Sequence, residues 1–150
     1  MGAWDRDRVH DKVVGVIAKL GRCDPQQLAQ LTRVFKREDP AEVFEGLFSV
    51  LTSDRRFVTQ EFAGRLLLEV SPKCPRTDLD NMLIALLPVW ELSVEQVPWY
   101  FQREFGTPDL GDALRRVADR KLPPEERKAL QTFAWWIRFE LDDTDGGLGV

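Results

Sequence analysis

Few residues of this 150-residue sequence have the types and spacing that catalysis requires. His10 is its only histidine, so a catalytic triad, a histidine-based zinc site or a histidine general base would each depend on it. The charged stretch 5–12 around it predicts a solvated surface side chain. The glycine patterns of phosphate-binding loops and the GxSxG of a nucleophile elbow do not occur. We therefore expect no enzyme, no cofactor and no metal site.

Carboxylates and thiols offer two further chemistries. Glu38 with Glu42, and Asp109 with Asp112, have helical spacing, but these acids fall in predicted first turns, where they stabilise the helix dipole. Two-carboxylate catalysis would need them in a cleft, so we favour a structural role. The cysteines, at positions 23 and 74, lack CxxC spacing and are predicted to be reduced and buried. A disulfide between them is the alternative, because sequence does not give the geometry.

Aromatic residues supply a recognition chemistry instead. A helix over residues 130–141 would carry a stripe from Leu130 to Leu141, with Trp135 and Phe139 roughly on the opposite side. Trp99 is similarly off the main face of its own helix. Such aromatics either pack against a third helix or anchor a partner. Trp99, Trp135 and Phe139 are therefore candidate partner-binding residues, and the two-sided last helix also predicts a homodimer through its surface.

Basic residues form one local cluster in a chain of net charge −4. Residues 1–75 carry net +1 and residues 76–150 net −5, which argues against a general nucleic-acid or anionic-membrane binder. Interleaved acids reduce the local field of the cluster, so nucleic-acid binding is the alternative function only. The candidate residues for that alternative are Arg115, Arg116, Arg120, Arg127 and Lys128.

Helix signals occur along the whole chain, and no strand pattern competes with them. The Asp24-Pro25 and Asp39-Pro40 pairs place a capping residue before proline, as at helix starts. Further caps are predicted at Thr59, Thr77 and Ser93. After a first helix from Asp5, helices are predicted to start near residues 25, 40, 60, 78, 94, 108 and 124. The fold class is therefore all-α, with about eight helices.

The short connections predict antiparallel hairpins that recur about every 30–38 residues, the scale of helical repeats. With these starts, residues 5–141 resemble the HEAT-like and armadillo-like α-solenoids, as a right-handed array of about four hairpins. The resemblance implies a scaffold that binds proteins along a helix surface. It also makes a HEAT-like base-excision protein the form that the nucleic-acid alternative would take. An up-and-down helical bundle is the alternative architecture.

Composition fits an ordinary soluble domain, with 43% hydrophobic and 31% charged residues. We expect one all-helical domain over 1–141 and an acidic, glycine-rich flexible tail over 142–150. The charged N-terminal stretch differs from a signal peptide, and no apolar run is long enough for a membrane span. These features predict a cytoplasmic, non-enzymatic interaction or scaffold module that binds a protein partner through helix surfaces.

Overall fold

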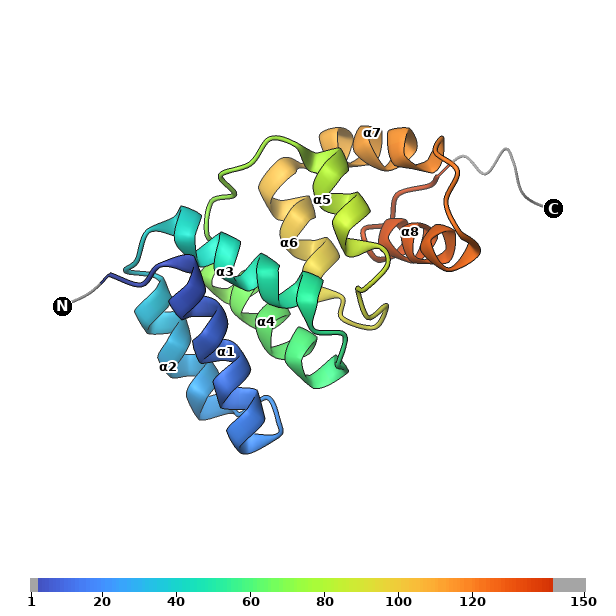
Figure 1. Ribbon diagram of the computed structural model, residues 1–150. Coiled ribbons are helices and arrows are strands. Elements are labelled where there is room, and N and C mark those ends of the chain that lie inside the picture. Colours follow the sequence, from blue (N-terminus) through green and yellow to red (C-terminus); the bar gives the residue numbers. More distant parts are fainter. Residues whose placement is uncertain (1–2, 142–150) are drawn as a thin grey trace.

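Eight α-helices and no strand make up the regular structure of residues 3–141, the part of the chain that the computed structural model describes (Figure 1). The predicted all-α fold with eight helices is confirmed. The predicted tail, 142–150, lies outside the described residues. The helices are α1 (Arg6–Leu20), α2 (Pro25–Phe35), α3 (Pro40–Ser53), α4 (Phe57–Val70), α5 (Leu79–Leu86), α6 (Gln96–Phe105), α7 (Thr107–Ala118) and α8 (Pro124–Trp136).

The first three helices begin at aspartates, as their sequence signals predict. The side chains of Asp5, Asp24 and Asp39 each accept a hydrogen bond from a backbone N–H of the first turn that follows. Each such cap contributes about 1 kcal/mol. Proline at the first position of α2 and α3 fixes a helical φ where no N–H donor is needed.

Later helix starts differ from the predicted caps. Thr59 is buried inside α4, which already begins at Phe57, and neither Thr77 nor Ser93 caps a helix. The Ser93 hydroxyl instead donates to the carboxylate of Glu91. These capping predictions are wrong. Before α5 and α6 the chain is held by contacts with other helices, Arg76 with Glu45 and Glu91 with Gln60, which local spacing does not encode.

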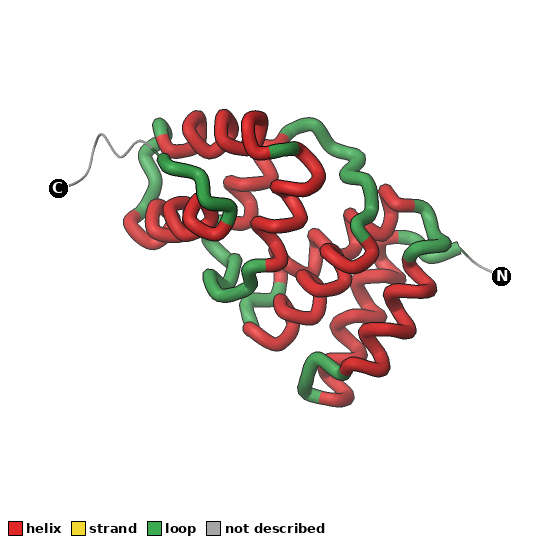
Figure 2. Tube along the Cα trace, turned by 180° about the vertical axis from the view of Figure 1, so that it is seen from behind, coloured by secondary structure: helices red, strands yellow, loops and turns green. Residues whose placement is uncertain are grey.

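The helices are arranged in two rows of alternate elements (Figures 1 and 2). Helices α1, α3, α5 and α7 pack successively in one row, and α2, α4, α6 and α8 in the other. The α1–α3 contact is close enough to require a glycine, since a Cβ on Gly46 would lie 2.5 Å from the Cβ of Val9. Buried hydrophobic side chains from all eight helices form one cluster. No helix within 3–141 is long and apolar enough to cross a bilayer.

The segment between α4 and α5 is held by polar contacts to the neighbouring helices. The Tyr100 hydroxyl donates to the Pro72 carbonyl, and the backbone N–H of Cys74 donates to Glu104. Arg76 makes a bidentate ion pair with Glu45, at 2.8 and 2.9 Å. Both cysteines are free thiols, as predicted, and burial raises the pKa of Cys74 to about 11. Cys74 is buried, whereas Cys23 is only half-buried.

The side-chain amide of Gln60, on α4, is completely buried and joins two chain segments. Its Nε2 donates to the carbonyls of Leu51 and Asp54, both at 3.0 Å, and of Val89 at 2.9 Å. Its Oε1 accepts from the N–H of Glu91 at 2.7 Å. One side chain thus satisfies backbone groups at the end of α3 and in the connection that leads to α6.

Replacing Gln60 by leucine is expected to lower the free energy of unfolding by about 3 kcal/mol, because buried carbonyls and an N–H lose their partner. Urea denaturation followed by circular dichroism measures this change. Gln26→Leu, at an exposed position of α2, is the matched control and should change stability by about 0.5 kcal/mol or less. A Gln60→Leu protein as stable as the control variant would contradict the proposed role of the amide.

Candidate functional site

All three predicted partner-binding residues line one open pocket at the C-terminal end of the array. The pocket has a volume of about 660 Å³ and lies between α6, α8 and the turn that follows α8. Trp99 comes from α6, Trp135 from α8 and Phe139 from the turn. The other lining residues are Gln102, Trp136, Ile137, Arg138 and Glu140.

Three tryptophans form a row along the pocket. Trp135 and Trp136 pack edge to face with centroids 4.8 Å apart, and Trp136 meets Trp99 at 6.1 Å. The indole N–H of Trp136 donates to the Leu92 carbonyl at 2.8 Å, and that of Trp99 to the Trp136 carbonyl at 3.2 Å. Two of the rings are therefore fixed by hydrogen bonds. Trp135 is 67% exposed and Trp99 38%, so the row ends at the surface.

Helix α8 ends at Trp136, and the predicted continuation to Leu141 is wrong. Arg138 adopts a left-handed conformation with φ 56°, and its N–H donates to the Trp135 carbonyl. The N–H of Phe139 donates to the Ala134 carbonyl at 2.9 Å, which completes a Schellman turn. This turn usually contains glycine at the left-handed position. Arginine stands there instead, so the sequence contains no stop signal.

Phe139 does not extend the face of Trp135, because the turn brings it back onto α7. Its ring lies on Gly111, where a Cβ would come within 2.3 Å of the Phe139 Cε1 atom. The Arg115 guanidinium carbon lies over the ring, 4.7 Å from its centroid. Phe139 is therefore a half-buried wall of the pocket rather than part of a second apolar helix face.

Trp136 and Gln102 belong to the pocket but were not among the predicted site residues. On a helix over 130–141, Trp136 falls on the flank between the two faces, and its spacing gives no reason to prefer it. The Gln102 amide donates to the Ile137 carbonyl at 3.2 Å and to the Thr107 hydroxyl at 3.0 Å, so it connects α6 to the turn. Such a contact depends on the reversal of the chain after α8.

The basic residues of the nucleic-acid alternative mostly serve neighbouring parts of the fold. Arg116 makes a bidentate ion pair with Asp80 of α5, at 2.8 and 2.9 Å, which raises the arginine pKa and lowers that of the aspartate. Arg115 lies 3.4 Å from Asp112 and beside Phe139.

The remaining three candidates lie around the α7–α8 connection. Arg127 donates to the carbonyl of Ala118, the last residue of α7, and to that of Arg120 just beyond it. Arg120 and Lys128 are exposed and make no ion pair within residues 3–141. These two side chains are therefore the cations of the predicted cluster whose charged groups have the fewest contacts in the fold.

His10 lies beside a serine, but the hydrogen bonds do not have the direction of a nucleophile–base pair. Its Nδ1 is 2.7 Å from the Ser49 hydroxyl, which itself donates to the Gly46 carbonyl at 2.7 Å. A serine proton donated to this carbonyl is not available to the imidazole, whereas an activated serine donates to its base. His10 is half-buried between α1 and α3 rather than fully solvated, and it links these helices.

Glu38 and Glu42, the first of the two carboxylate pairs, both accept hydrogen bonds from the segment before and at the start of α1. Glu42 accepts from the backbone N–H and guanidinium of Arg6, and these hydrogen bonds lower the pKa of Glu42 to about 2. Glu38 accepts from the Trp4 N–H at 3.1 Å. Residues 3–141 contain no group of three or more His, Cys, Asp or Glu side chains placed to hold a metal ion.

The turn after α8 predicts opposite effects of two substitutions at one position. Arg138→Gly should raise the free energy of unfolding by about 0.5–1 kcal/mol, because glycine adopts the left-handed conformation without strain. Arg138→Val should lower it by at least about 1 kcal/mol, since a β-branched side chain resists this conformation. Thermal and urea denaturation measure both changes. Equal stability of the two variants would contradict the turn.

No known protein family matches this chain, and no curated protein or solved structure matches it either. The resemblance to HEAT-like and armadillo-like α-solenoids therefore remains a prediction from helix spacing, although the two rows of alternate helices are compatible with it. The geometry of the tryptophan pocket is the principal observation that bears on function.

Proposed function

We propose that this chain is a non-enzymatic interaction module that binds a protein partner through the pocket formed by Trp99, Trp135 and Phe139. The observation that carries the proposal is the 67% exposure of Trp135, the highest among the large hydrophobic side chains that the structure describes as exposed. Covering the rest of this side chain would contribute roughly 2–4 kcal/mol. Tryptophans of this kind are frequent anchors of protein interfaces.

The surroundings of Trp135 favour binding because they are already ordered. Hydrogen bonds fix the rings of Trp99 and Trp136, so these side chains lose little conformational freedom when a partner binds. The exposed charges of Arg138 and Glu140 lie at the rim. An apolar segment of a partner, either a helix or an extended chain, fits a pocket of this composition.

Capture experiments with matched variants test the function. Three tagged proteins, the wild type, Trp135→Ser and Phe57→Ser, are each recovered from the native cells. The proteins that co-purify with each are then quantified. Phe57 is an appropriate control because it is 47% exposed, on α4, and does not line the pocket. Trp135→Ser should reduce the recovery of the partner at least about tenfold, since anchor residues contribute 2 kcal/mol or more. Phe57→Ser should retain it.

Equal recovery by the wild-type chain and Trp135→Ser would contradict the role of the pocket. Circular dichroism melting of each variant separates loss of binding from loss of folding. The alternative function is nucleic-acid binding through the basic cluster. It predicts a salt-dependent mobility shift of duplex DNA that Arg120→Glu/Lys128→Glu weakens and Trp135→Ser leaves unchanged.

A second copy of the chain is one partner that the pocket could accept, and it gives a separate prediction. If Trp135 inserts into the same pocket of another copy, the contact is isologous and produces a closed dimer. The average mass measured by light scattering should then rise toward that of a dimer as the protein concentration increases. Trp135→Ser should remain monomeric. A monomer at the highest accessible concentration would rule out the homodimer, and the proposed partner would then be a different protein.

A further inference from the structure

A second surface lies at the opposite end of the array from the tryptophan pocket, along the hairpin of α1 and α2 (Figure 1). Two adjoining pockets, of about 240 and 470 Å³, share Asp11 and Lys12 and therefore form one depression. We call it the α1–α2 furrow. Its apolar lining consists of Trp4, Gly15, Val16, Leu20, Leu31 and Val34.

The furrow is open, elongated and apolar at its base. Its lining begins at Trp4, just before α1, and continues along α1 to Leu20; the helix itself spans about 21 Å at the rise of an α-helix. A Cβ on Gly15 would meet no atom within 4 Å, so space remains above the middle of the helix. The helices α3 and α4 pack on this hairpin, α3 against α1 and α4 against both α1 and α2. A partner helix of about four turns matches this length.

The hairpin is basic although the whole chain is acidic. The hairpin, residues 6–35, contains six Lys or Arg and three Asp or Glu, a net charge of +3, against −4 for the full sequence. Among the three acids, Asp24 is occupied by Arg22 at 2.8 Å and by the α2 cap. The charge of this end of the molecule is therefore opposite to that of the chain as a whole.

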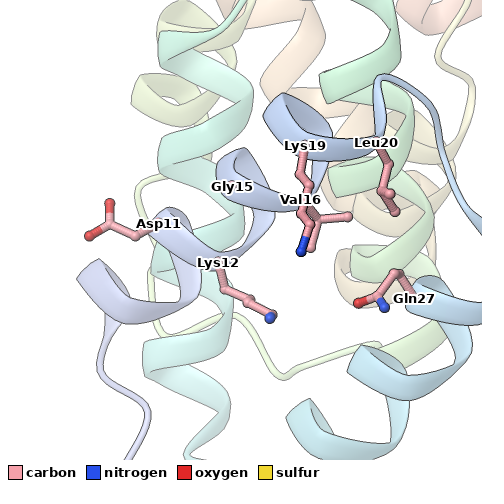
Figure 3. Close-up of a pocket in the computed structure, with 7 residues that line it drawn as sticks. All are labelled: Asp11, Lys12, Gly15, Val16, Lys19, Leu20 and Gln27. Carbon is pink, nitrogen blue, oxygen red and sulfur yellow. The ribbon is translucent and has the colours of Figure 1, made fainter.

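Three cations line the furrow: Arg8, whose guanidinium lies 4.0 Å from the Trp4 ring centroid, and the two lysines Lys12 and Lys19. Lys12 and Lys19 are two helical turns apart, about 10 Å, and neither makes an ion pair within residues 3–141. Figure 3 shows both side chains extending into the space between α1 and α2, whereas the Asp11 carboxylate points away. Gln27 faces them from α2 and adds no negative charge.

We propose that the α1–α2 furrow docks an acidic amphipathic helix of a partner protein. Leucine-like side chains at i, i+3 or i+4, and i+7 would enter the apolar base, as in other helix-in-groove complexes. Acidic residues seven positions apart on that helix would meet Lys12 and Lys19. A second copy packed through the same face would bring two hairpins of net charge +3 together, which charge repulsion opposes. This site is independent of the proposed tryptophan pocket.

A pair of synthetic peptides tests the furrow. One labelled peptide of about 18 residues has leucines at helical i, i+3, i+7 and i+11 spacing and glutamates beside them, and its twin has lysines in place of the glutamates. Fluorescence anisotropy should show saturable binding of the acidic peptide, weakened by salt, and at least about tenfold weaker binding of its twin. Backbone amide shifts in NMR spectra should change in α1 and α2.

Protein variants separate the charges from the apolar base. Lys12→Glu/Lys19→Glu should weaken binding of the acidic peptide at least about tenfold. The control variant Lys121→Glu/Lys128→Glu has the same net charge and should bind the peptide as the wild type does. Gly15→Leu fills the base without altering charge and should also weaken binding. Both lysine pairs consist of exposed side chains, so folding is expected to survive, and circular dichroism checks it.

Several results would overturn the proposal. These are absence of saturable binding, equal affinity for the two peptides, equal binding by Lys12→Glu/Lys19→Glu, or amide shifts outside the hairpin. Preferential binding of duplex DNA or of phosphatidylserine vesicles through the same lysines would identify an anionic surface as the occupant instead. Trp135→Ser should bind the acidic peptide as the wild type does, so the failure of either proposed site is distinguishable from the failure of the other.

Discussion

The buried amide of Gln60 is the contact on which the geometry of the tryptophan pocket depends. It hydrogen-bonds Val89 and Glu91, in a connection between α5 and α6 that has no helical ladder of its own to satisfy its backbone groups. On its other side this connection receives the indole N–H of Trp136 at the Leu92 carbonyl. The α5–α6 connection thus joins the core of α4 to the pocket at α8: Gln60 binds its backbone at Val89 and Glu91, and Trp136 binds it at Leu92.

Local signals in the sequence predict the fold well where one residue and its neighbours determine the outcome. Asp24 and Asp39 cap helices because an aspartate before proline satisfies the first N–H groups without help from distant residues. The end of α8 is predicted wrongly because distant residues determine it. Its left-handed Arg138 is compensated by tertiary contacts, the Phe139 ring on Gly111 and the Gln102 amide on the Ile137 carbonyl. No periodicity over 130–141 encodes these.

The candidate site was predictable in part for a related reason. Aromatics that leave the main stripe of a helix must meet either a neighbour or solvent, so Trp99 and Trp135 were identifiable from spacing alone. Phe139 was identified from a helical geometry that does not exist at its position, yet it still lines the pocket. Trp136 and Gln102 could be assigned only after the chain reversal was known, because that reversal places a backbone carbonyl within reach of the amide.

The two ends of the array leave different apolar surfaces uncovered. Each terminal helix or hairpin has neighbours on one side only, and repeat arrays usually turn a polar face outward there. Here α8 folds its following turn over α7 and leaves Trp135 uncovered, whereas the α1–α2 hairpin leaves an apolar furrow under Lys12 and Lys19. A salt-insensitive aromatic contact at one end and a salt-sensitive charged contact at the other would respond differently to ionic strength. The two proposed sites can therefore be told apart by the salt dependence of binding at each.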